Sequence, residues 1–218
     1  MTAADVARLA ASGEGPSIEF KHRVPRPARL AKEVVAFANT DGGRLFVGVN
    51  DDGTVVGVKD GEEEAYAIQH ALETHVDPPI AFRIQHIPIL ATHRDVLMID
   101  VPPSLHRPHF VVDEAAEAVP QAYVRVGASS VEASKEAVKL MRRGPDDARN
   151  VRFEFGDKEA LLMRYLDAYG RITVAGFAQI AGVPVRQARH TLVLLTRAGV
   201  LAHHTGAKEH TFTLPLAA

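Results

Sequence analysis

The sequence predicts an α+β fold in two domains. Helical and strand patterns interleave along the first two thirds of the chain without the strict alternation of a βαβ protein. After residue 150 the pattern changes to three helices followed by a short hairpin. Residues 143–150 are polar, contain Gly and Pro and show no apolar period. We therefore expect them to link a domain of residues 1–142 to one of residues 151–218.

Apolar periodicity defines the elements of the first domain. Apolar residues three and four positions apart predict helices, and Gly or Pro residues mark where these helices end. Alternation of apolar and polar residues predicts half-buried strands. The expected helices are residues 5–11, 28–38, 62–75 and 131–141. The expected strands are residues 18–21, 45–49, 55–58, 81–87, 96–101, 109–112 and 122–126, with a hairpin around Asp51-Asp52-Gly53.

The second domain has the layout of a winged helix-turn-helix. Its expected elements are helices at residues 158–169, 174–181 and 185–197 and a hairpin of residues 200–203 and 210–214. The last helix carries Arg186, Gln187, Arg189 and His190 at its N-terminal end, where base contacts are made, and Lys208 lies in the hairpin. Arg and Gln form bidentate bonds to guanine and adenine edges. The alternative is a module that binds protein.

The charges are unevenly distributed. The whole chain has a net charge of −2 and a pI near 6.6. Residues 151–218 nevertheless carry eight Lys and Arg against five Asp and Glu, a net +3, which leaves −5 on residues 1–150. Because local fields steer ligands more than the total charge does, the second domain is compatible with DNA or RNA.

Composition excludes several classes of protein. The absence of cysteine rules out disulfides, thiolate nucleophiles and cysteine-ligated metals. No apolar run approaches the roughly 18 residues of a membrane span, and the N-terminus lacks the pattern of a signal peptide. We therefore expect a cytoplasmic protein without a membrane partner. The G-x-x-x-x-G-K-[ST] pattern is also missing, so ATP binding through a phosphate loop is not expected.

Three carboxylates near the N-terminus are candidates for a metal site. Glu14 lies in a Gly-rich turn, Glu19 on the first predicted strand and Asp51 at the hairpin tip. If the two strands pair, these carboxylates converge on one edge and can hold Mg²⁺ or Mn²⁺, which a nuclease uses to activate water. Lys21 would then be a catalytic residue that offsets negative charge. The alternative is a solvated strand face and hairpin tip.

A run of basic residues begins at the same strand. It comprises Lys21, His22, Arg23, Arg26, Arg29 and Lys32. No acidic residue interrupts the run, so it can bind phosphates, with Lys21, Arg23 and Arg26 as the candidate nucleic-acid contacts. It is equally compatible with a solvated loop that leads into a helix.

Four segments of the first domain match one known family in order. They are GEGPSIEFK (residues 13–21), VVAFANTDGGRLFVGVNDDG (34–53), VPPSLHRPHFVV (101–112) and QAYVRVGASSVEASKEA (121–137). In these segments the chain resembles the Schlafen-type AlbA-like domain, formerly classed as a divergent ATPase domain. The resemblance covers about residues 4–141. The domain occurs in many bacterial transcriptional regulators, often fused to a C-terminal winged helix.

The resemblance implies a mixed-sheet α+β fold and a role in nucleic-acid binding. In animal Schlafen proteins the domain is an endoribonuclease that acts on structured RNAs such as tRNA. Its active site is a Glu, a second Glu five residues on, and an Asp after the Gly-Gly strand. Glu14 and Glu19 match the first two and Asp51 the third, with Asp52 as the alternative. Because those nucleases use two such lobes, this chain is expected to form a homodimer.

These features lead to three hypotheses. The first is a DNA-binding transcriptional regulator whose winged helix contacts DNA. The second is an endoribonuclease that depends on Mn²⁺ or Mg²⁺ and uses Glu14, Glu19 and Asp51. The third is a scaffold whose winged helix binds another protein. The expected partner is DNA or RNA. The cofactor considered is Mg²⁺ or Mn²⁺. The sequence leaves open whether the chain is an enzyme.

Overall fold

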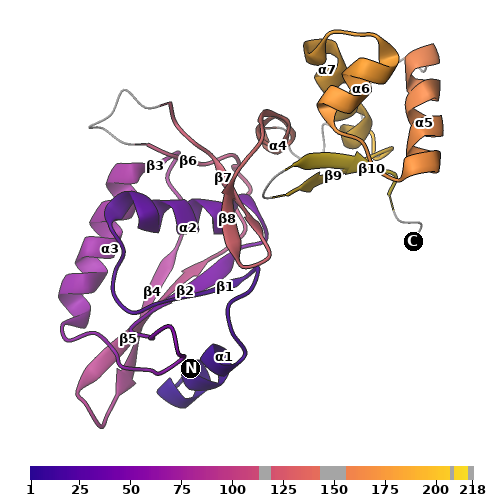
Figure 1. Ribbon diagram of the computed structural model, residues 1–218. Coiled ribbons are helices and arrows are strands. Elements are labelled where there is room, and N and C mark those ends of the chain that lie inside the picture. The colour runs from indigo at the N-terminus through magenta and orange to yellow at the C-terminus, as the bar shows by residue number, and fades with distance from the viewer. Residues whose placement is uncertain (113–118, 143–155, 207–208, 216–218) are drawn as a thin grey trace. The chain divides into compact units, whose positions relative to one another are not determined.

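The structure is a computed structural model that describes residues 1–112, 119–142, 156–206 and 209–215. The chain divides into two compact units, Met1–Glu132 and Ala133–Ala218 (Figure 1). This division places residues 133–142, which the sequence assigns to the first domain, in the C-terminal unit. The linker expected at residues 143–150 lies outside the described residues.

The N-terminal unit is built on a mixed four-stranded sheet. The helices of this unit are α1 (Ala3–Ala11), α2 (Pro27–Asn39) and α3 (Gly61–His75). The strands are β1 (Ile18–Lys21), β2 (Gly43–Val47), β3 (Val76–Asp77), β4 (Arg83–Ile89), β5 (Arg94–Val101), β6 (Phe110–Val111), β7 (Tyr123–Val126) and β8 (Ser129–Glu132). The sheet has the order β1-β2-β5-β4, with β1 and β2 parallel and the other neighbours antiparallel. The predicted α+β fold with a mixed sheet is confirmed.

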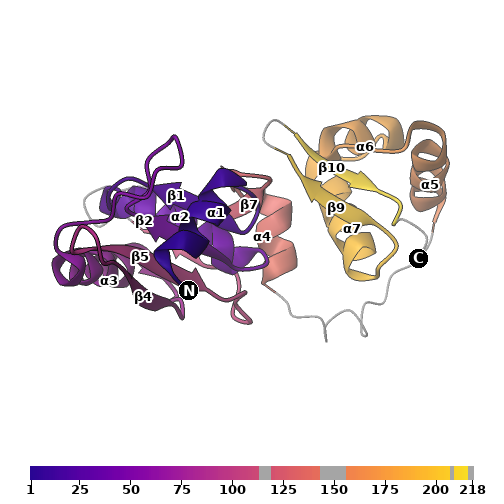
Figure 2. The same ribbon diagram turned by 90° about the horizontal axis from the view of Figure 1, so that it is seen from below.

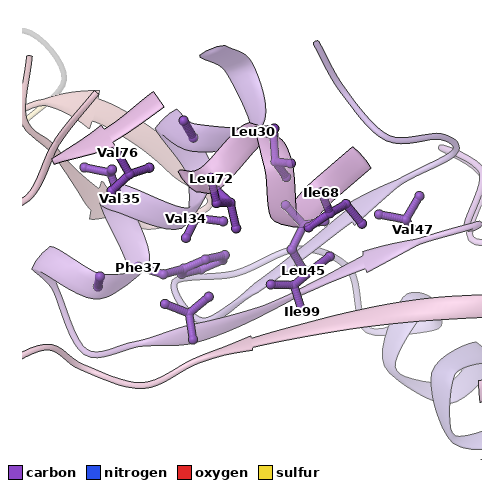
Figure 3. Packing of buried hydrophobic residues seen from close by; sticks show 14 of the residues in the cluster. Leu30, Val34, Val35, Phe37, Leu45, Val47, Ile68, Leu72, Val76 and Ile99 are labelled. Carbon is purple, nitrogen blue, oxygen red and sulfur yellow. The ribbon is translucent and has the colours of Figure 1, made fainter. Parts of the chain in front are cut away.

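Alternation along the strands gives the sheet two apolar faces. Leu45, Val47 and Ile99 pack with residues of α2 and α3 on one face (Figure 3). Phe46 and Met98, next to them in sequence, pack with Val6 of α1 in a second cluster. Figure 1 shows α2 and α3 on one side of the sheet and α1 on the other. The short pairs β3–β6 and β7–β8 lie outside this sheet.

Two predicted elements differ from the structure. The hairpin of residues 45–49 and 55–58 is reduced to a single bridge, Val49 with Val55, because Gly48 and Gly57 take positive φ values of 104° and 68° that interrupt a regular ladder. The helix predicted for residues 131–141 was wrong at its start. The residue Val131 pairs with Val124 in the β7–β8 hairpin, and helix α4 (Lys135–Met141) begins after it.

The C-terminal unit contains α4 and a group of three helices with a two-stranded ribbon. These are α5 (Asp157–Tyr169), α6 (Val174–Ala181), α7 (Val185–Arg197), β9 (Ala202–Thr205) and β10 (His210–Thr213) (Figure 2). Their apolar faces share one core that includes Leu162, Phe177, Leu192 and Phe212. The predicted bounds of α6 and α7 are confirmed.

Among the described residues, no helix is both long enough and apolar enough to cross a membrane.

Candidate functional site

Arg125, from β7, is the centre of a buried polar cluster in the N-terminal unit. Its side chain is 1% exposed, and its guanidinium lies over the ring of Phe37 at 4.8 Å from the centroid. Its Nη1 donates to Glu19 Oε2 at 3.0 Å and to Glu33 Oε2 at 3.2 Å. It also donates to Ser130 Oγ at 3.1 Å. One cation thereby joins β1, α2, β7 and β8.

Both oxygens of the Glu19 carboxylate are paired with cations. Glu19 is 5% exposed, and its Oε1 is bound by Lys21 Nζ while its Oε2 is bound by Arg125. Lys21 Nζ also donates to the carbonyl oxygen of Phe20 at 3.1 Å and lies 3.9 Å from Glu14 Oε1. Arg125 and Lys21 therefore supply the positive charge that a bound metal ion would otherwise supply to Glu19.

Glu14 and Asp51 line one hollow of about 380 Å³. The hollow is lined by Ala10, Gly13, Glu14, Phe20, Asn50, Asp51 and Gly53. Glu14 Oε1 accepts a hydrogen bond from the backbone nitrogen of Phe20 at 3.1 Å, which orients this carboxylate. The pairing of β1 with β2 brings the two acids together as the sequence predicts, but Glu19 is not among the lining residues.

A metal ion held jointly by Glu14, Glu19 and Asp51 does not fit this arrangement. Within the described part of the chain, no three His, Asp or Glu side chains are placed so that they could hold a metal ion. The alternative third ligand, Asp52, accepts a hydrogen bond from the backbone nitrogen of Thr54 at 2.8 Å, and this bond lowers the pKa of Asp52. Binding of Mg²⁺ or Mn²⁺ stays a prediction of the sequence.

Sequence reasoning missed Arg125, Glu33 and Ser130. A local signal existed for Arg125, which is a charged residue between two valines on a strand that is otherwise apolar. A buried charge of this kind needs partners. The partners themselves carry no local signal, because they lie 106, 92 and 5 residues away in the sequence.

The two ends of the basic run are partly buried, and its middle is exposed. Lys21 is partly buried and neutralised by Glu19, whereas Arg23, Arg26 and Arg29 are exposed. Lys32, half-buried on α2, places its Nζ over the ring of Tyr123 at 5.3 Å. The predicted contacts Arg23 and Arg26 are thus accessible, and Lys21 is not free.

Helix α7 presents a polar end to solvent. Arg186, Gln187 and His190 are exposed and, with Lys139 and Pro184, line a hollow of about 470 Å³. The opposite side of the helix is buried, with Ala188, Leu192 and Leu195 in the core. Gly182, three residues before the start of α7, has a φ of 62°, ends α6 and allows the chain to turn into α7. Lys139 of α4 was not predicted to contribute.

Arg189, predicted as a nucleic-acid contact, is engaged within the protein. Its Nε is bound to Oε1 of Glu136 on α4, and its side chain is 26% exposed. Burial, the largest single effect, raises the pKa of Glu136, but the hydrogen bond and charge of Arg189, together with hydrogen bonds from Ser134 and from the backbone of Glu136, lower it overall. The remaining predicted contact, Lys208, lies outside the described residues.

The family relationship agrees with the matched segments of the sequence. The model of the family described as Schlafen, AlbA_2 matches residues 14–134, more than half of the chain. The solved N-terminal domain of a RecG-related protein from Nitrosomonas europaea is 23% identical, with a TM-score of 0.46 over 59% of this chain and 91% of that one. The DIP2311 protein from Corynebacterium diphtheriae is 21% identical, with a TM-score of 0.42 over 61% of this chain and 26% of that one. By its match to the family model, the chain belongs to the Schlafen AlbA_2 family.

Proposed function

We propose that this chain is a DNA-binding transcriptional regulator whose C-terminal unit contacts duplex DNA through the N-terminal end of α7. The observation that carries the proposal is the joint exposure of Arg186, Gln187 and His190 on a helix whose other side is buried. Side chains of this kind, on a helix that enters the major groove, can read base edges. Membership of the Schlafen AlbA_2 family, which is associated with nucleic-acid binding, supports the proposal.

The order of elements in the C-terminal unit supports a winged helix-turn-helix. Three helices precede a two-stranded ribbon, and Ile172, before α6, forms a bridge with Phe212 of β10. This bridge ties the ribbon to the segment between α5 and α6. In such motifs the second helix of the turn is the reading helix, which here is α7.

A binding titration tests the proposal. The wild-type chain should bind fluorescein-labelled mixed-sequence duplexes at low salt, with an affinity that falls steeply as salt is added. Arg186→Gln should weaken binding to a preferred duplex by roughly 5- to 150-fold, the effect of losing about 1–3 kcal/mol of base contact. Arg164→Gln, which removes an exposed charge from α5, is the matched control and should change affinity less than twofold. Failure of the wild type to bind any duplex would contradict the proposal.

A homodimer belongs to the same proposal. Regulators with helix-turn-helix units commonly bind two half-sites, and the spacing of those sites mirrors the two-fold axis of a dimer. Sedimentation equilibrium should then give a mass of about twice 23.6 kDa for the chain in solution. A single species at the monomer mass, with and without duplex, would remove this part of the proposal.

Endoribonuclease activity is the second candidate, favoured by the hollow that Glu14 and Asp51 share. It is less well supported, because Glu19 is already neutralised by Lys21 and Arg125. Incubation of the chain with tRNA and Mn²⁺, beside its Asp51→Asn variant, tests it. Cleavage by the wild type alone would establish the activity, and equal cleavage or none would exclude a role for Asp51.

A further inference from the structure

The N-terminal unit carries a cluster of exposed cations that its own acidic residues do not neutralise. We define the basic segment as residues 22–29, in which His22, Arg23, Arg26 and Arg29 are all exposed. Among the described residues, none of the three arginine side chains forms an ion pair or a hydrogen bond. By contrast, Arg8 of the same unit pairs with Asp5. The charge of the basic segment is therefore available to a ligand.

The basic segment is held in place by the core beneath it. Val24 packs against the apolar cluster of α2 and α3, and Leu30, at the other end, is fully buried. Pro25 and Pro27 restrict the backbone between these anchors. The carbonyl oxygen of Arg26 accepts hydrogen bonds from the backbone nitrogens of Arg29 and Leu30 at 2.9 and 3.0 Å. A ligand would thus meet a backbone that is already ordered, which lowers the entropic cost of binding.

The cations continue as a row along α2. Arg29 and Lys32 are three residues apart on α2, a spacing that makes them neighbours on the helix surface with Cβ atoms about 5–6 Å apart, and Arg26 is the N-cap residue three positions before Arg29. No acidic residue lies in the first turn of α2, and Glu33 is buried toward Arg125 rather than placed among them. Arg23 extends the row before the helix. A row of cations at this spacing suits a chain of phosphates.

From this geometry we propose that the basic segment binds the phosphodiester backbone of a nucleic acid, as a second surface separate from α7. Phosphate contacts position a nucleic acid without reading its sequence, so this surface adds affinity and not base preference. A lipid surface is less suited, because the exposed residues of the segment include no Trp, Phe or Leu that could insert into the interface. The inference does not require that α7 bind DNA.

Removal of the three charges tests the proposal in the full-length chain. Anisotropy titrations would use a fluorescein-labelled single-stranded 20-mer and a duplex of the same length, over a series of salt concentrations. The variant Arg23→Gln/Arg26→Gln/Arg29→Gln should bind the single strand at least tenfold more weakly at low salt. Its plot of log affinity against log salt should be shallower by about 2, because each lost phosphate contact contributes about 0.7 for single strands.

Two matched variants separate charge from structure. Replacing the same three arginines with lysine keeps the charge and should retain most of the affinity. The triple variant Lys59→Gln/Arg83→Gln/Arg94→Gln removes three charges elsewhere in the unit, and its affinity should stay within twofold of the wild type. Thermal melts of all variants should lie close to that of the wild type, since among the described residues none of the replaced side chains forms a hydrogen bond or an ion pair.

The outcomes are distinct. An unchanged salt slope in the Gln variant overturns the proposal, as does an equal loss in the Lys59/Arg83/Arg94 control. If the Gln variant instead loses binding to vesicles of phosphatidylserine and phosphatidylcholine while its oligonucleotide affinity is unchanged, the surface serves a membrane and the proposal is wrong. Arg186→Gln, measured in parallel, reports on α7 alone, so failure of one surface is distinguishable from failure of the other.

Discussion

The charge of Arg125 determines how the acidic residues near the N-terminus of this chain behave. Two buried carboxylates, Glu19 and Glu33, are bound to one guanidinium, whose second nitrogen donates to the carbonyl oxygen of Gly15 at 2.7 Å. A buried ion cluster is stable when every member keeps its partners, and it is strongly destabilised when one charge is removed. Arg125 therefore acts on Glu19 as a structural partner, in a position where the sequence offers a metal ion and a solvated strand face as alternatives.

Replacement of Arg125 by Met should destabilise the N-terminal unit by about 3–5 kcal/mol, because Glu19 and Glu33 would be left buried without their cation. Urea unfolding followed by circular dichroism measures this loss. Adding Glu19→Gln to the variant should restore part of it, since one unpaired charge is then removed. A change in the free energy of unfolding below about 1 kcal/mol would mean that water or Lys21 replaces Arg125 at little cost.

His203 should make the C-terminal unit sensitive to acid. Burial, together with the nearby His210 and His204, lowers the pKa of His203 to about 4, although Glu136 opposes the shift. Its Nε2 is buried and has no hydrogen-bond partner among the residues that the structure describes, and its ring packs on Phe212 at 4.9 Å between centroids, so the folded protein disfavours the charged form.

The unfolded chain, with an ordinary His pKa near 6.5, binds a proton that the folded unit does not. The free energy of unfolding should therefore decrease by roughly 1–3 kcal/mol as the pH falls from about 6.5 to 4. Urea titrations of the wild type and of His203→Phe at several pH values test this. The variant should lose most of this dependence, whereas His204→Gln, at an exposed position, should keep it. Equal pH profiles for wild type and His203→Phe would contradict the assignment.

At the scale of elements, α4 and α7 are joined by opposite charges. Glu136 on α4 binds Arg189, and Arg197 Nη2 donates to the carbonyl oxygen of Lys139 at 2.5 Å. The ion pair neutralises Arg189 of α7. It also places the carboxylate of Glu136 beside the N-terminal end of α7, the surface proposed to contact DNA. Helix α4 therefore limits the positive potential of α7 while Lys139 adds to it.

Glu136→Gln should strengthen duplex binding about three- to tenfold, because it removes a negative charge and releases Arg189. Fluorescence anisotropy at low salt measures the change. Glu63→Gln, which removes an exposed carboxylate from α3, serves as the control for net charge and should have less than a twofold effect. If Glu136→Gln binds more weakly than the wild type, the ion pair instead holds α7 in its binding conformation.

At the scale of the whole molecule, the chain has separate hydrophobic cores in its two units. Calorimetry should then show two transitions. Leu192→Ala should lower only the transition of the C-terminal unit and Leu45→Ala only that of the N-terminal unit, each by about 2–5 kcal/mol of unfolding free energy, since both side chains are fully buried. One transition that both variants shift alike would show that the units unfold together.

Sequence patterns predicted the elements best where local signals agree. The bounds of α6 and α7 follow from apolar spacing, the left-handed glycine after α6 and the proline before α7. They failed at residue 131, a valine between Ser130 and Glu132 that suits either a helix or a strand, because the pairing with β7 decides between the two. The same patterns overestimated the length of the hairpin. The backbones of Gly48 and Gly57 approach so closely that a Cβ on Gly48 would lie 2.8 Å from the Cα of Gly57, and this close approach takes the place of regular strand pairing.

The sequence by itself determined the family, the order of helices and strands, and which polar residues are candidates for a site. These follow from motifs and periodicities that extend over a few turns or strands. Only the tertiary structure decided what those candidates contact: Glu19 is neutralised by a residue 106 positions away, while Arg23 and Arg26 have no ion-pair partner in the described part of the chain. Electrostatic partners are chosen by proximity in space, and no local pattern carries that information.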